Sequence, residues 1–416
     1  MKIFNKLLLS SLIGISANAT TLKELINNTI KNNENIQSMN IQNKALNKSY
    51  NSVQNTYNPT LNIGANYLKL DGDMRNVQIG QTSSAFAKLS IDLYNGGKNN
   101  AIKKQKEYEY KSSLNNTLSS TKQTILQVVN IYFNTKTIIE NIKVLQEKSI
   151  ALKAQYDRVK TKYDLKMTTL DEVYKFKSEF ESNNYLIEEL KYQKEQQLQT
   201  LSLISNIDIK QLNNENLLNK TNLKYVKSDA IKSLQYQLKA QEENKNILSS
   251  ANKPQIKLQD TYSLYNYDDY NTKLLTDLPE QQNQLMLSVN YKIFDTTTKN
   301  KIVSANLQKQ SLQKKINYLQ KQEKMKFILA SKNLSTSKLK ISSAKSAVTM
   351  ANSVYNTVKI KYENSVVDNI SFLDALSKKS YNQALYQKAL NDYEIAKANY
   401  YFSSGVDYTT ILNNWK

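Results

Sequence analysis

The stretch "KLSIDLYNGGKNNAI" (88–102) joins two kinds of structure. Before the glycine pair, apolar Leu89, Ile91 and Leu93 alternate with polar residues, as in a strand that has one apolar face. After the pair, the chain has no further glycine and no proline up to residue 162, which predicts one long helix. Gly96 and Gly97 therefore stand at a change of direction, where the absence of a side chain relieves crowding.

The same crossing occurs again about 200 residues later, as "SVNYKIFDTTTKNKI" (288–302). Two further landmarks recur with a similar offset. Pro59 and Pro254 each follow a polar helical stretch and open an alternating run, and "VKTKYDLKMTTLDEVYKFKSE" (159–179) is matched by "VKIKYENSVVDNISFLDALSK" (358–378). The shared order and spacing predict an internal duplication.

Each repeat is predicted to read helix, strand, loop, strand, long helix, turn, helix. The predicted domains are a signal peptide (1–19), a first repeat (20–205), an inter-repeat linker or equatorial segment (206–228), a second repeat (229–404) and a short tail (405–416). Helices are predicted over 22–57, 97–162, 170–205, 229–252, 296–361 and 370–403, strands over 61–67, 85–93, 256–264 and 285–293, and loops over 71–84 and 266–283.

The N-terminus has the pattern of an export signal. Lys2 and Lys6 precede a short apolar run, Leu7–Ile15, and Ala17–Ala19 offers small residues at a cleavage site. No later segment approaches 18 apolar residues, so no transmembrane helix is predicted. The mature chain is therefore expected outside the cytoplasm.

Composition excludes several functions. The 416 residues include no cysteine and no histidine, which removes Ser-His and Cys-His nucleophiles, disulfides, and thiolate or imidazole metal sites. The formal charge is +21, but the lysines are spread among glutamates as on solvated helix faces, so no nucleic-acid partner is predicted. Carboxylate-based catalysis remains open at this point.

Strands of about 10 residues with one apolar and one polar face are typical of membrane barrels. The alternative is a half-buried strand in a soluble sandwich. Four strands cannot close a barrel, although strands from several protomers could. The narrow apolar seams of the helices fit a wall with water on both sides, or an ordinary coiled coil.

The order of these landmarks resembles the TolC-type outer-membrane efflux family over essentially the whole mature chain. The resemblance rests on "YNPTLNIGANY" (57–67), "KPQIKLQDTY" (253–262), "LYNGGKNNAI" (93–102), "KYDLKMTTLDEV" (162–173) and "KYENSVVDNISFLDAL" (361–376). It implies a mainly α fold with a β-barrel contribution, in which a homotrimer forms a 12-stranded barrel and an α-helical periplasmic tunnel.

The resemblance also implies the function of the chain. The trimer would be an outer-membrane exit duct in contact with lipid, which receives cargo from an inner-membrane pump through a periplasmic adaptor protein. Such a duct is not an enzyme and holds no cofactor. Efflux is favoured over type I secretion. A non-channel coiled-coil protein with a structural or adhesive role is the alternative.

Further implications concern the periplasmic turns, which in the family follow a Tyr-x-x-Gly pattern and contact the adaptor. Here Tyr163 and Tyr362 keep the aromatic residue, whereas Lys166 and Ser365 stand in place of the glycines. Because positive φ costs a non-glycine residue about 1 kcal/mol, these turns are predicted to differ in shape. Val367 occupies the position of a gate arginine, so the salt bridge of that arginine cannot form.

The family's gate, as the resemblance implies, contains links between protomers from a tyrosine to an acidic residue. By position these are Tyr362 and Glu172, with Asp171 beside the acid. Asp374 matches one of two aspartates that narrow the entrance, and Ser371 stands at the other. Three-fold symmetry would make Asp374 a ring of three carboxylates. The alternative for Asp374 is a solvated acid in the first turns of a helix.

Overall fold

The computed structural model describes residues 19–54, 58–71, 77–217 and 222–407, and the predicted signal peptide lies outside them except for Ala19. The chain forms two compact units. The first holds Met1–Met39, Thr117–Asp229 and Gln320–Lys416, and the second holds Asn40–Asn116 and Ala230–Leu319. Each unit therefore takes segments from both halves of the sequence.

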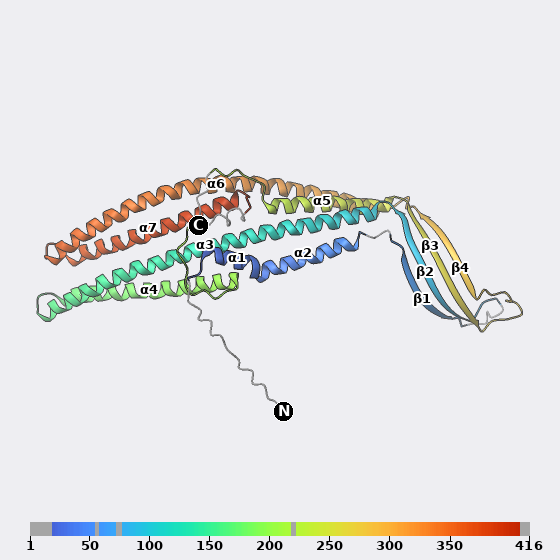
Figure 1. Ribbon diagram of the computed structural model, residues 1–416, viewed down its shortest axis with the longest axis horizontal. Coiled ribbons are helices and arrows are strands. Elements are labelled where there is room, and N and C mark those ends of the chain that lie inside the picture. Colours follow the sequence, from blue (N-terminus) through green and yellow to red (C-terminus); the bar gives the residue numbers. More distant parts are fainter. Residues whose placement is uncertain (1–18, 55–57, 72–76, 218–221, 408–416) are drawn as a thin grey trace, which may run out of the picture. The chain divides into compact units, whose positions relative to one another are not determined.

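The second unit contains a four-stranded antiparallel sheet. Its strands are β1 (Thr60–Lys69), β2 (Gln81–Asn95), β3 (Gln255–Asp268) and β4 (Gln281–Asn290). They lie side by side in the order β1-β2-β3-β4, so the two sequence-adjacent pairs join through β2 and β3 (Figure 1). In this chain β1 and β4 are the edges of the sheet.

The strands are longer than predicted at the ends that carry the loops. β2 begins at Gln81 and β3 continues to Asp268, and these two residues are paired. Parts of the predicted loops 71–84 and 266–283 are therefore strand. The alternation of apolar and polar residues fades there, but backbone pairing between neighbouring strands continues without it.

At the opposite ends of the strands, the structure departs from the predicted alternation in β4 and in β2. β4 stops at Asn290, before the predicted Tyr291 and Ile293. In β2, the register with β3 shifts between Asp92 and Tyr94, so Leu93 lies in a bulge and leaves the predicted alternation.

The described residues form seven α-helices. They are α1 (Leu22–Asn32), α2 (Glu34–Ser52), α3 (Lys98–Asp164), α4 (Leu170–Ser205), α5 (Asp229–Ser249), α6 (Thr296–Glu363) and α7 (Asn369–Ser403). A 3-10 turn, Ser250–Asn252, follows α5. The last five agree with prediction to within three residues at each end. In the described part of the chain, no helix combines the length and the apolar character that spanning a bilayer requires.

The predicted single helix 22–57 is wrong, because the chain breaks at Asn33. This residue has an extended ψ of 120°, its amide Nδ2 donates to the Ile204 carbonyl at 2.8 Å, and its Oδ1 accepts the Ile36 amide at 3.1 Å. Asn33 thus ends α1, begins α2 and ties both to the end of α4. An asparagine in a polar helical sequence gives no local sign of this distant partner.

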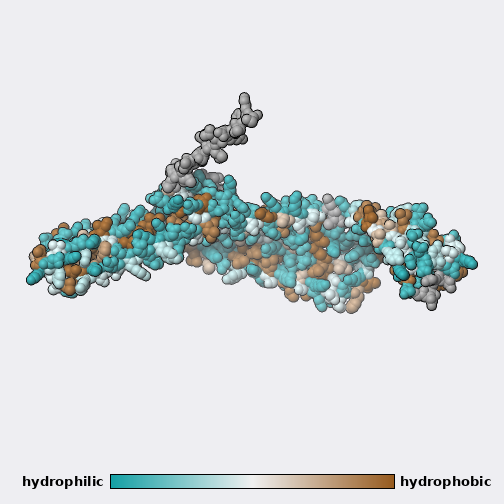
Figure 2. All heavy atoms as spheres, turned by 90° about the horizontal axis from the view of Figure 1, so that it is seen from below, coloured by the Kyte–Doolittle hydropathy of each residue, from teal (hydrophilic) through white to brown (hydrophobic). Residues whose placement is uncertain are grey.

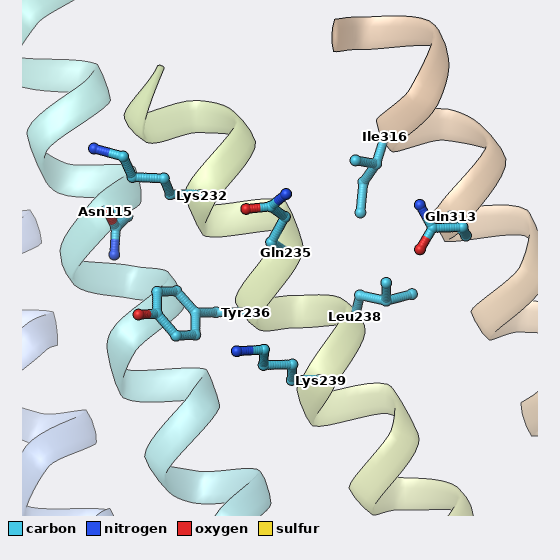
Figure 3. Close-up of a pocket in the computed structure, with 8 residues that line it drawn as sticks. All are labelled: Asn115, Lys232, Gln235, Tyr236, Leu238, Lys239, Gln313 and Ile316. Atoms are coloured by element: carbon cyan, nitrogen blue, oxygen red, sulfur yellow. The ribbon is translucent and has the colours of Figure 1, made fainter. Parts of the chain in front are cut away.

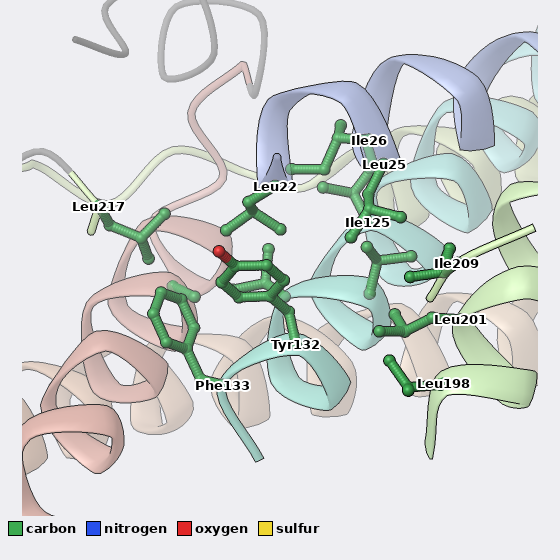
Figure 4. Packing of buried hydrophobic residues seen from close by; sticks show 13 residues of the cluster. Leu22, Leu25, Ile26, Ile125, Tyr132, Phe133, Leu198, Leu201, Ile209 and Leu217 are labelled. Carbon is green, nitrogen blue, oxygen red and sulfur yellow. The ribbon is translucent and has the colours of Figure 1, made fainter. Parts of the chain in front are cut away.

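The first unit has its main apolar core where α1, α3 and α4 meet (Figure 4). Tyr132 and Phe133 of α3 are fully buried, with ring centroids 5.2 Å apart in an edge-to-face arrangement. Around them lie Leu22, Leu25, Ile26, Leu198, Leu201, Ile209 and Leu217. Elsewhere the helices bury narrow seams, and on the face seen in Figure 2 hydrophobic side chains are scattered among hydrophilic ones.

The predicted inter-repeat segment is held to this unit by polar contacts at Leu217. Glu394 and Lys397 of α7 form a buried ion pair of 2.6 Å between Oε1 and Nζ. The other oxygen of Glu394 accepts the Leu217 amide at 2.7 Å, and Lys397 Nζ donates to the Leu217 carbonyl at 2.9 Å. Because both charges are paired and hydrogen-bonded, their burial is tolerated and fixes the path of the segment.

Candidate functional site

The two faces of the sheet differ in character. The register places Leu61 opposite Leu89 and Leu258 opposite Leu287 on one face, which therefore carries the predicted apolar residues of all four strands. These side chains are exposed; Ile63 is 81% and Leu285 is 71% accessible. An apolar surface of this extent requires an apolar environment outside the chain.

Two tyrosines on the apolar face have the same role in the two strand pairs. The hydroxyl of Tyr67 donates to Gln81 Oε1 at 3.2 Å, and that of Tyr262 donates to Gln281 Oε1 at 2.8 Å. Each glutamine is the first residue of the neighbouring strand. A ring on the apolar face with a polar tip near the strand end is the arrangement of interfacial aromatic residues.

The predicted hinge between strand and helix lies in the second unit. Pro59 and Pro254 stand directly before β1 and β3, where the missing N–H removes no ladder bond. Gly96 and Gly97 have φ of +69° and +85°, so the first crossing uses the left-handed conformation that glycine permits. A Cβ on Gly96 would lie 2.5 Å from the carbonyl oxygen of Ser250.

The second crossing uses an aspartate instead of glycine. Asp295 Oδ1 accepts the backbone amide of Thr298 at 3.1 Å, and Oδ2 accepts the Thr298 hydroxyl at 2.7 Å. Lys292 Nζ lies 3.1 Å from Oδ2. These donors, Thr298 first, hold the pKa of Asp295 far below its usual range. The charged carboxylate caps α6, so this crossing needs no positive φ.

The helix pairs α3–α4 and α6–α7 of the first unit end in two matching turns. Lys166 and Ser365 have φ of +57° and +56°, so both take the left-handed conformation although neither is glycine. In each turn the left-handed residue donates to the carbonyl three residues back, and the next residue donates to the carbonyl five back, which is the Schellman motif. In the first turn the N···O distances are 2.8 Å from Lys166 to Tyr163 and 2.8 Å from Met167 to Lys162. In the second they are 3.0 Å from Ser365 to Tyr362 and 2.8 Å from Val366 to Lys361.

Tyr362 and Glu172, predicted as a gate pair, are brought together at these turns. The Tyr362 hydroxyl donates to Glu172 Oε1 at 2.9 Å, and the Thr168 hydroxyl donates to Oε2. Burial, followed by the bond to Glu172, raises the pKa of Tyr362 well above its ordinary value of 10.0. The bond joins the end of α6 to the start of α4 within one chain, whereas the sequence expectation placed such links between protomers.

The other predicted gate residues make local contacts. Asp374 is exposed, and its Oδ2 lies 2.7 Å from Nζ of Lys378, one turn later on α7. Asp171 pairs with Lys175 at 3.6 Å, and a hydrogen bond from Thr169 lowers the pKa of Asp171.

Three of the predicted residues lie on the surface of the turns. The backbone amide of Ser371 donates to the capping Asp368 at 2.8 Å, and its side chain is exposed. Val367 is half-buried. Tyr163, the counterpart of Tyr362, is 39% exposed and faces no equivalent acid, because Ser371 stands at the position that matches Glu172.

Sequence reasoning missed the apolar cluster that joins the two helix pairs near their turns. The Phe372 ring lies 5.0 Å from that of Tyr362 and 6.2 Å from that of Phe176, and both phenylalanines are fully buried. The signal was available, since Phe372, Ala375 and Leu376 have the i, i+3, i+4 spacing of a buried helix face.

Arg158 was also missed. Its Nη2 donates to the carbonyl of Glu363, the last residue of α6, at 2.9 Å. A cation at a helix C-terminus satisfies an unpaired carbonyl and interacts favourably with the helix dipole. The signal was the residue type, because the chain contains only two arginines among its many lysines.

A groove between α3, α5 and α6 lies in the second unit and holds about 440 Å³ (Figure 3). Lys239 of α5 lies over the rings of Tyr236 and Tyr108, at 5.4 and 5.7 Å from their centroids. The described residues that line the groove include no acidic side chain, no serine and no threonine. Across the described residues, no group of three or more acidic side chains could hold a metal ion either.

One segment of the chain matches a known protein family. Residues 25–206, which lie almost entirely within the predicted first repeat, match the outer membrane efflux protein family. This segment of the chain is therefore similar in sequence to that family of TolC-type channels. The match supports an outer-membrane location with a large helical part in the periplasm, and the role of a transport duct rather than an enzyme.

Solved outer-membrane proteins have the same fold. The Campylobacter jejuni CmeC outer membrane channel matches with a TM-score of 0.83 and 15% identity, over 92% of this chain and 85% of that chain. VceC from Vibrio cholerae matches with a TM-score of 0.80 and 12% identity, over 92% of this chain and 96% of that chain. The open state of the Neisseria gonorrhoeae MtrE channel matches with a TM-score of 0.76 and 16% identity, over 92% of this chain and 88% of that chain. The predicted fold class, long helices with four amphipathic strands, is confirmed. No curated protein sequence matches the chain.

Proposed function

We propose that this chain is an outer-membrane efflux protein that acts as a homotrimer and forms a 12-stranded barrel in the outer membrane. One observation carries the proposal. The sheet has one exposed apolar face and one polar face, and it ends in two unpaired edges, β1 and β4. Pairing β1 of one protomer with β4 of the next in three copies would remove every edge, turn the apolar face to lipid and enclose the polar face.

The trimer would pass cargo from a periplasm-spanning tripartite pump to the exterior. Its partners are a periplasmic adaptor protein and an inner-membrane pump, which supplies the energy. Efflux of small molecules is favoured over type I protein secretion, in agreement with the name of the matched family. In this proposal, residues 20–205 and 229–404 are the two repeats of each protomer, and 206–228 is the equatorial segment.

The periplasmic entrance would be the end of the helix pairs where α3–α4 and α6–α7 turn. The gate residues are Tyr362, Glu172, Asp171, Asp374 and Ser371. Support comes from the bond between Tyr362 and Glu172, which any movement separating the two turns must break.

The adaptor would contact the outer surface of the same turns, at Tyr163, Lys166, Ser365 and Val367. The exposed side chains of Lys166 and Ser365, held at the tips of two identical Schellman turns, present a repeated surface that supports this assignment. Pro59, Pro254, Gly96 and Gly97 would form the hinge between barrel and tunnel.

Two measurements on the purified full-length protein test the duct. In mild detergent it should have the mass of a trimer, and in planar lipid bilayers it should form discrete ion-conducting pores. A water-soluble monomer without pore activity would overturn the proposal and favour a non-channel coiled-coil protein.

A deletion strain separates efflux from secretion. Loss of the chain should raise the accumulation of a fluorescent small-molecule dye in cells and leave the set of proteins in the culture medium unchanged. Disappearance of one secreted protein, with dye accumulation unchanged, would favour type I secretion.

A further inference from the structure

The polar face of the sheet carries few charges, and their positions are fixed by the strand register. Its ionisable acidic and basic side chains are Lys88 and Asp92 on β2 and Lys257 on β3. Asp92 stands directly opposite Lys257 on the neighbouring strand, so these two opposite charges offset each other. Lys88 has no such counterpart.

The surroundings of Lys88 are polar and uncharged. Its direct neighbours across the sheet are Asn62 on β1 and Thr261 on β3. Phe86 occupies the same face, because its ring covers Gly64, where an added Cβ would lie 2.6 Å from the ring. On the other side of Lys88, Gln259 Nε2 donates to Ser90 Oγ at 3.3 Å.

Assembly from identical chains cannot supply the missing acid. A neighbouring protomer would place its β4 beside β1, or its β1 beside β4. The polar face of β1 bears Thr60, Asn62, Gly64, Asn66 and Leu68, and that of β4 bears Gln282, Gln284, Met286, Ser288 and Asn290. The edge strands of neighbouring protomers therefore add no charge to this face. Each copy of the chain contributes one ammonium, that of Lys88, without an opposite charge.

Lys88 is the central residue of β2, which spans Gln81–Asn95. At about 3.3 Å per residue, it lies roughly 23 Å along the strand from either end. The ammonium is thus far from the loops at one end and from the helices at the other.

From these positions we propose that Lys88 forms a ring of positive charge at mid-height in the barrel and makes this section selective for anionic solutes. The inference rests on the proposed trimeric duct. It assigns to the barrel a preference for negatively charged small molecules and inorganic anions, independent of the acidic residues at the periplasmic entrance. Rings of like charge on a pore wall select ions of opposite sign.

The size of the effect follows from the geometry of a 12-stranded barrel, in which the three ammoniums lie about 10 Å from the axis. In water at 0.1 M salt, their screened potential should raise the local anion concentration about two-fold and the anion-to-cation ratio about four-fold. At 1 M salt the Debye length is about 3 Å, and the effect should nearly vanish.

The test is the reversal potential of the reconstituted protein in planar bilayers under a potassium chloride gradient. Lys88→Gln should lower the chloride-to-potassium permeability ratio about four-fold at 0.1 M, and Lys88→Arg should retain it. Lys69→Gln is the matched control, because Lys69 is the last residue of β1 and its register places it on the apolar face. Asp92→Asn should shift the ratio in the opposite direction from Lys88→Gln.

The outcomes separate this inference from the proposed duct. Pores in which Lys88→Gln and Lys69→Gln give the same reversal potential as the unmodified chain would overturn the ring and leave the duct intact. If Lys88→Gln fails to assemble, the salt dependence of the unmodified pore is the test. A chloride preference that stays the same when the salt is raised from 0.1 to 1 M would also overturn the ring. Failure of the unmodified chain to form pores would overturn both proposals.

Discussion

The hydrogen bond between Tyr362 and Glu172 makes a quantitative prediction about gating. Tyr362→Phe removes one hydroxyl and keeps the ring, whose contacts with Phe372 at 5.0 Å and Phe176 at 6.2 Å should persist. The substitution therefore isolates the bond from the apolar cluster. Glu172 keeps the donor from Thr168 on its other oxygen, so the carboxylate is not left without a partner.

A hydrogen bond to a charged group contributes about 1.5–3 kcal/mol. Because the Tyr362 side chain is only half-buried, the lower value applies, about 1.5 kcal/mol for each protomer. A difference of 1.4 kcal/mol is a factor of about ten in an equilibrium constant. Tyr362→Phe should therefore shift the closed-to-open ratio about ten-fold per protomer, and up to about a thousand-fold if three protomers open together.

The assay is the open probability of single pores in planar bilayers. Tyr362→Phe should raise it strongly, and Tyr163→Phe, at the exposed counterpart in the other turn, should not. A double-mutant cycle with Glu172→Gln should give a coupling energy of about 1 kcal/mol or more, since the two side chains share one bond. Equal open probabilities for Tyr362→Phe and Tyr163→Phe would refute the assignment of this bond to the gate.

The bond also predicts a response to alkaline pH. The folded-state pKa of Tyr362 is raised above the ordinary value of 10.0, first by burial and then by the bond to Glu172. The stabilisation is therefore fully present below pH 10 and is lost as the pH rises from 10 through the folded-state pKa. The open probability of the unmodified pore should therefore rise above pH 10. Tyr362→Phe should lack this rise, because it has no hydroxyl to ionise.

Further predictions concern the ion pair at the entrance and the two crossings. Lys378→Met should strengthen block of the pore by hexamminecobalt(III), because it unmasks the Asp374 carboxylate, and Asp374→Ala should weaken it. Gly96→Ala should lower the guanidinium unfolding midpoint more than Gly97→Ala; both lose about 1–2 kcal/mol to positive φ, but only Gly96 adds a clash, at 2.5 Å from a backbone oxygen. The contribution of Asp295 to stability should be present above its ordinary pKa of 3.8 and lost as the pH falls, so Asp295→Asn should flatten the acid side of the unfolding profile.

Much of the fold could be predicted because its main signals are local. The strands follow from a two-residue alternation after Pro59 and Pro254, and the long helices from stretches without glycine or proline. The break at Asn33 could not be predicted, since it depends on the Ile204 carbonyl, 171 residues away in the sequence. A polar helical sequence looks the same with or without such a partner.

The candidate site also has features that the sequence predicts and features that depend on tertiary packing. Tyr362 and Glu172 could be named from their places in the two turns, but the structure joins them within one chain. The contribution of Arg158 depends on α3 lying beside the end of α6, which only tertiary packing decides. The residue type of Lys166 alone predicts a cost for its left-handed conformation, and the two hydrogen bonds of the Schellman turn offset that local cost.

The two halves of the chain share the order strand pair, long helix and shorter helix but differ at the crossings and at the turns. One crossing uses Gly96 and Gly97 at positive φ, and the other uses Asp295 as a helix cap. One turn holds Tyr362 against an acid, and the other leaves Tyr163 exposed. In a homotrimer, six similar helix pairs therefore form two sets of three. The proposed gate would use this difference, because six equivalent links would hold every pair equally and leave no set of helices to move against the other.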